Sequence, residues 1–135
     1  MNNDVIILEG TPKHIYFYEI IKATCLKYPL YTLYCYCSTN QGALNLFEFI
    51  NSNLNVQILD RLKYSLYGDK SFIFKNKSQF TILSAIDSNL RGHRYNKVII
   101  CGELERDKQR AIQYHVISYD YVKKYIIKKE GGTND

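Results

Sequence analysis

Short apolar runs alternate with segments of helical periodicity along this chain, and that order restricts its possible folds more than any other feature. Residues 4–9 carry four consecutive aliphatic side chains, a pattern typical of a buried strand. Apolar residues then recur at helical spacing over residues 14–27. Residues 30–37 and 41–53 repeat the strand and the helix. Strands separated by helices of about ten or more residues favour an α/β fold, a three-layer sheet of mainly parallel strands flanked by helices.

The middle of the chain departs from this simple alternation. Residues 56–66 fit either a short strand or a helical turn. Residues 71–84 show strand-like alternation on both sides of Asn76-Lys77, a pair typical of tight turns, and this predicts an inserted β-hairpin. The aliphatic residues within 97–101 predict a central strand.

The C-terminal part predicts one more strand over residues 114–117 and a last helix over residues 119–129. With 135 residues, of which 46% are hydrophobic and 23% charged, the chain can bury one core. We therefore expect a single α/β domain over residues 1–129. The tail, residues 130–135, contains two consecutive glycines and is expected to fray.

The sequence gives no sign of a membrane segment or a secretion signal. No run approaches the roughly 18 consecutive apolar residues of a membrane-spanning helix. The N-terminus lacks the basic start and apolar centre of a secretion signal. We expect a soluble, intracellular protein.

The four cysteines fall within predicted helices and strands rather than at regular positions in loops. This placement favours buried free thiols. Cys35 and Cys37 lie on the same face of a predicted strand, whereas the histidines are not grouped near them in sequence. We therefore expect no metal site.

Basic residues are unevenly distributed along a chain with a net charge of +5. Lys123, Lys124, Lys128 and Lys129 crowd the predicted last helix, and Arg94 precedes the central strand. Such clusters can bind the phosphate backbone of a nucleic acid. A solvated, lysine-rich helix face is the alternative interpretation.

The end of the predicted central strand carries the most suggestive chemistry. In many phosphate-binding α/β domains, an aliphatic strand ends in an Asp that holds a metal ion and a Glu that polarises water. Here the corresponding residues are Gly102 and Glu103, and a glycine side chain cannot bind magnesium. Glu103 is either a catalytic, water-orienting base or an exposed acid that pairs with Arg91 or Arg94.

Residues 74–85, followed by residues 90–100, resemble the ATPase domain of large terminase subunits, the DNA-packaging motors of tailed phages. The similarity covers roughly residues 70–103 and comprises a hairpin, a Ser-Ala step, the pair Arg91-Gly92 and the aliphatic strand. It implies a viral (bacteriophage) protein of the host cytoplasm with a P-loop NTPase-like fold, connected with DNA packaging.

The same resemblance implies that the nucleotide site is degenerate. A motor ATPase needs a glycine-rich loop after its first strand, whose amides and lysine hold the phosphates. Of that loop, Gly10 and Lys13 remain, no Ser or Thr follows the lysine, and Pro12 removes one amide donor. Gly10, Lys13 and Arg91 are the candidate phosphate- or nucleotide-binding residues. The length also implies a truncated protein without the nuclease domain of terminases.

Three classes of function follow from these observations. The first is a non-catalytic pseudoenzyme without a cofactor, a binding module that engages DNA or a protein partner of a nucleic-acid machine. The second is an enzyme, either a reduced NTPase that uses ATP and Mg²⁺ or a metal-dependent phosphate-ester enzyme that uses Glu103, Asp87 and His93. The third is self-association into a homo-oligomer through the tyrosine-rich segment 28–37 and the hairpin.

Overall fold

The computed structural model describes residues 4–9, 14–65, 69–84, 95–102, 107 and 123–128, and for 4–9 and 123–128 it describes the backbone. In chain order the elements are β1 (Asp4–Glu9), α1 (His14–Ala23), β2 (Thr32–Cys37), α2 (Asn40–Asn53), a 3₁₀ turn (Val56–Ile58), β3 (Leu59–Tyr64), β4 (Lys70–Phe74), β5 (Gln79–Ser84), β6 (Lys97–Cys101) and β7 (Lys123–Lys128). This order confirms the predicted α/β class.

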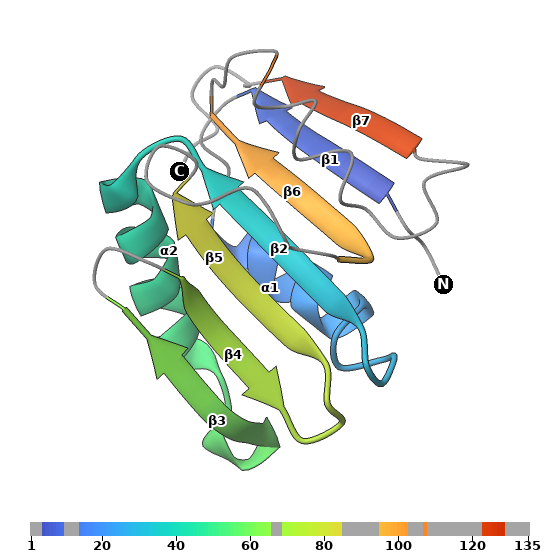
Figure 1. The fold of residues 1–135 in the computed structure, drawn as a ribbon, viewed down its shortest axis with the longest axis vertical. Coiled ribbons are helices and arrows are strands. Elements are labelled where there is room, and N and C mark those ends of the chain that lie inside the picture. Colours follow the sequence, from blue (N-terminus) through green and yellow to red (C-terminus); the bar gives the residue numbers. More distant parts are fainter. Residues whose placement is uncertain are drawn as a thin grey trace.

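All seven strands belong to one sheet, in the order β3-β4-β5-β2-β6-β1-β7 (Figure 1). The neighbours from β5 to β7 run parallel, whereas β4 is antiparallel to both β3 and β5. Residues 5–8 of β1 pair in register with residues 98–101 of β6. The first strand and the predicted central strand are therefore neighbours in the same sheet.

Helices α1 and α2 cover the same face of the sheet (Figure 1). Phe17 and Ile21 of α1 and Leu46 and Ile50 of α2 pack into one buried cluster with Leu33 and other side chains from that face of the sheet. The expected three-layer sheet of mainly parallel strands is therefore corrected. The sheet is mixed, because β3 and β4 extend it with antiparallel pairings, and both described helices lie on one face.

Local signals account for the bounds of the helices. Thr39 caps α2, because its hydroxyl accepts a hydrogen bond of 3.0 Å from the amide of Gly42. Helix α1 ends at Ala23, four residues earlier than predicted. Next to that end, the Thr24 hydroxyl donates to the Ile20 carbonyl at 2.7 Å, a local bond that competes with helix continuation.

None of the helices that the structure describes is long and apolar enough to cross a membrane.

The predicted hairpin is confirmed as β4 and β5, with Phe72 opposite Phe80. No glycine occupies its turn, and Lys77 adopts the left-handed conformation with φ of 72°. The ambiguous segment 56–66 contains both of its expected forms, because the 3₁₀ turn runs directly into β3. Strand β3 pairs with β4 and thereby widens the hairpin to three strands.

The last predicted helix is wrong over residues 123–128, which form strand β7 parallel to β1. Its centre, Tyr125-Ile126-Ile127, has the aromatic and β-branched composition of a strand, and every residue of β1 has a partner in β7. The expected strand 114–117 and the tail 130–135 lie outside the described residues.

Candidate functional site

A cavity of about 190 Å³ opens at the carboxyl ends of β2 and β6, beside the first turns of both helices. Ligands of parallel α/β sheets usually bind at this edge, where strands end and helices begin. The described wall consists of His14, Phe17, Cys37, Ser38, Thr39, Gly42, Asn45, Leu46, Cys101 and Gly102. This cavity is the candidate site.

Three thiols meet beside the cavity, and two of them line it. The sulfur atoms of Cys35, Cys37 and Cys101 all lie within 4.8 Å of one another, and the Sγ atoms of Cys35 and Cys101 are 3.6 Å apart. Side chains two residues apart point to the same face of a strand, which groups Cys35 with Cys37. Cys101 joins them because it is paired with Cys37 across β2 and β6. The fourth cysteine, Cys25, is outside this thiol cluster, with its sulfur 3.5 Å from the Gln79 carbonyl.

The surroundings shift the pKa values of the Cys37 and Cys25 thiols in opposite directions. Hydrogen bonds from Cys101 and Cys35 hold the pKa of Cys37 well below its usual range, and the nearby charges of His14 and Lys70 act in the same direction. Burial, by contrast, raises the pKa of the Cys25 thiol to about 12. Among these cysteines, Cys37 is the one that its surroundings prepare to carry a negative charge.

A buried hydroxyl lies next to the thiol cluster. Ser84, Cys37 and Cys101 form one row across β5, β2 and β6, because Cys37 is paired with Ser84 on one side and with Cys101 on the other. Ser84 is only 5% exposed, and its Oγ has no hydrogen-bond partner within the part of the chain that the structure describes. It is therefore able to donate to a group at the thiol cluster.

Position 102 admits no side chain. Gly102 has φ of +85°, a region that residues with a Cβ rarely adopt. A Cβ built there would lie 2.9 Å from Cβ of Ser38 and closer still to its hydroxyl oxygen. Ser38 is itself held in place, because its amide donates to the Cys101 carbonyl at 3.1 Å. The place where the resemblance expects a metal-binding Asp is thus closed by both conformation and packing.

The described cavity wall favours soft metal ions over magnesium. Magnesium requires oxygen ligands, mostly carboxylates and phosphates. Among the described wall residues there is no carboxylate, and the wall offers hydroxyls, an amide, an imidazole and two thiols. Thiolates prefer ions such as Zn²⁺ and Cu⁺.

Most of the site residues expected from the sequence are not placed. Glu103, Gly10, Lys13, Arg91, Arg94 and Lys129 lie outside the described residues, as do Asp87 and His93. Lys123, Lys124 and Lys128 are on strand β7, so the expected basic helix face is not formed by them.

The thiol cluster was not predicted from the sequence. Strand periodicity had already grouped two of its members, and a parallel pairing of residues 35–37 with residues 99–101 would have added Cys101.

No protein-family model and no curated protein sequence matches this chain. Its fold is similar to that of a large terminase from a thermophilic bacteriophage, solved in complex with ADP, with a TM-score of 0.57 and 12% sequence identity. The similarity covers 93% of this chain and 33% of the terminase, so this chain spans about a third of that protein's length. At this identity the likeness shows a terminase-like fold.

Proposed function

We propose that this chain is a non-catalytic binding module, which uses a terminase-like α/β fold as a scaffold and binds the phosphate backbone of a nucleic acid. The claim that the module is non-catalytic rests on the closed position 102. Phosphoryl-transfer enzymes of this general type depend on a metal ion held near the end of the central strand. Gly102 supplies no ligand, and Ser38 occupies the space that a ligand's side chain needs.

The size of the cavity supports the same conclusion. Pockets for small molecules usually measure about 300–1,000 Å³, and the cavity at the ends of β2 and β6 measures about 190 Å³. The similar terminase was solved in complex with ADP. An adenine nucleotide is therefore the ligand whose binding would contradict the claim that this module is non-catalytic.

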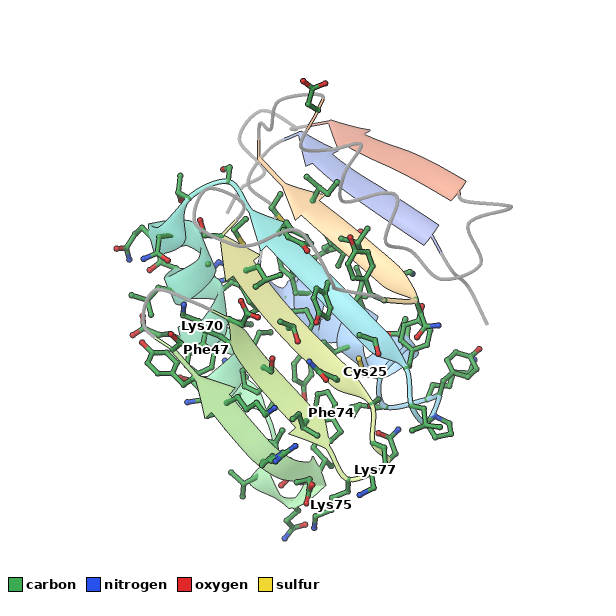
Figure 2. The ribbon with its side chains drawn as sticks, viewed as in Figure 1. Cys25, Phe47, Lys70, Phe74, Lys75 and Lys77 are labelled. Atoms are coloured by element: carbon green, nitrogen blue, oxygen red, sulfur yellow. The ribbon has the colours of Figure 1, made fainter. Side chains whose placement is uncertain are left out.

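The second half of the proposal rests on the opposite end of the sheet. Lys27, Lys75 and Lys77 are exposed there, on the loop after α1 and on the β4–β5 turn. Figure 2 shows Lys75 and Lys77 at the turn of the hairpin, far from Lys70 at the other end of β4. In a chain of net charge +5, this lysine end provides positive charge for phosphate contacts.

Hydrogen bonds hold the two segments of the lysine end together. The Asn76 side chain donates to the carbonyls of Cys25, at 2.7 Å, and Tyr28, at 3.4 Å. The Ser78 hydroxyl also donates to the Cys25 carbonyl at 2.7 Å, and the amide of Leu30 donates to the Asn76 carbonyl at 3.3 Å. The lysines therefore project from a connected surface rather than from two independent loops.

Fluorescence anisotropy with labelled duplex and single-stranded DNA tests the nucleic-acid half. We expect binding at low salt that weakens steeply between about 50 and 200 mM salt. The double variant Lys75→Glu/Lys77→Glu should bind at least about tenfold more weakly. The matched pair of single variants is Lys77→Glu at the turn and Lys63→Glu on edge strand β3, opposite Ser71. Both change the net charge equally, and Lys63→Glu should retain more of the affinity.

Three results would count against nucleic-acid binding: no complex at low salt, affinity independent of salt, or equal losses in Lys77→Glu and Lys63→Glu. The first of these would direct attention to a protein partner.

A further inference from the structure

We propose that Cys35, Cys37 and Cys101 together bind one thiophilic metal ion, Zn²⁺ or Cu⁺, at the floor of the cavity. This inference is independent of nucleic-acid binding, because the thiol cluster and the lysine end lie at opposite ends of the sheet.

The spacing of the sulfur atoms fits a common ion. Zinc–sulfur bonds of about 2.3 Å in a tetrahedral site place neighbouring sulfur atoms about 3.8 Å apart. The Sγ atoms of Cys35 and Cys101 are 3.6 Å apart, and no pair within the cluster exceeds 4.8 Å. Closing the cluster around an ion therefore requires shifts of about 1 Å or less, which side-chain rotation supplies.

The backbone fixes this arrangement. Cys35 and Cys37 come from one strand and Cys101 from its hydrogen-bonded neighbour, in the interior of the seven-stranded sheet. Ligands on rigid strands keep their geometry without an ion bound, so binding costs little ordering of the chain.

A hydroxyl beside the cluster suits a metal–thiolate unit. Ser84 is buried and in register with Cys37, and its hydroxyl has no hydrogen-bond partner within the described chain. Metal ligands are commonly oriented by such second hydrogen bonds.

A fourth ligand has access to the ion. Cys37 and Cys101 line the cavity, and His14 lines it as well. Zinc usually takes four ligands, and a water molecule from the cavity would complete its shell. Cu⁺ is satisfied by the three sulfur atoms alone.

Metal titration of the reduced, metal-free protein tests the proposal. Co²⁺ serves as a spectroscopic probe, because cobalt–thiolate bonds give intense ultraviolet charge-transfer absorption, and competition with chromophoric chelators measures Zn²⁺ and Cu⁺ separately. We expect one equivalent of metal in the wild-type protein. Cys37→Ser and Cys101→Ser should each lose at least about tenfold in affinity. Cys25→Ser is the matched control and should bind like the wild type.

The cobalt spectrum and the Cu⁺ competition of the wild-type protein decide even if the cluster variants fail to fold. Absence of the thiolate charge-transfer band together with no Cu⁺ bound in the competition would overturn the proposal, as would equal metal binding by the wild-type protein and a folded Cys37→Ser variant. A disulfide between Cys35 and Cys101 that forms in air and is insensitive to added metal would also contradict it.

Discussion

At position 102, the backbone and a neighbouring side chain both require glycine. The positive φ of Gly102 disfavours any residue with a Cβ, and Ser38 fills the adjacent space. From the sequence alone, Gly102 was visible as a missing acid, but its tight contact with Ser38 was not. That contact depends on the parallel pairing of β2 with β6, which brings two residues 64 positions apart together.

The substitution Gly102→Ala should destabilise the protein by about 2–4 kcal/mol. About 1–2 kcal/mol would come from the left-handed backbone and the rest from crowding against Ser38. Adding Ser38→Gly to this variant should recover the stability lost through crowding, whereas the loss caused by the left-handed backbone should remain. Urea unfolding of the two single variants and the double variant measures the coupling between these positions. Strictly additive effects, or a Gly102→Ala variant as stable as the wild type, would show that the two residues are not packed as described.

At the scale of elements, the sequence predicted correctly those helices and strands whose formation depends on interactions within the segment itself. Helix α2 was predicted nearly to the residue, because its cap Thr39 and its apolar spacing are both encoded within the segment. Strand β7 was mistaken for a helix, since its lysine-flanked apolar run fits either periodicity and only its pairing with β1 decides between them. The thiol cluster was missed for the same reason, because strand register is not a local property.

The connection between the loop after α1 and the β4–β5 turn gives a prediction at this scale. Asn76→Ala removes side-chain hydrogen bonds to the Cys25 and Tyr28 carbonyls and to the Ser78 amide. We expect it to destabilise the protein by about 1–3 kcal/mol, because partly buried polar groups lose their partners. Chemical denaturation measures the effect.

Asn53→Ala is the matched control for this experiment. Asn53 is exposed at the end of α2, and within the described residues its side chain makes one hydrogen bond, to the Phe49 carbonyl. Its substitution should change the free energy of unfolding by less than about 0.5 kcal/mol. If both substitutions had the same effect, Asn76 would not connect the two segments.

For the whole molecule, the described chain combines a terminase-like fold with thiols and a glycine at the ends of its parallel strands. The likeness to a phage large terminase extends over 93% of the chain at 12% identity, so the two folds are similar while few side chains are shared. At the edge where parallel sheets bind ligands, the described residues present three thiols and a closed glycine rather than a magnesium site. The central claim that we propose is that this scaffold does not bind a nucleoside triphosphate for hydrolysis.

Thermal unfolding with increasing ATP and Mg²⁺, together with an assay for released phosphate, tests this claim most directly. A ligand that binds the native state raises the melting temperature, and a concentration of about 100 times its Kd stabilises by about 2.7 kcal/mol. We predict an unchanged melting temperature at millimolar ATP and Mg²⁺ and no phosphate release above the buffer rate. A melting temperature that rises with ATP concentration, accompanied by magnesium-dependent phosphate release, would contradict the account.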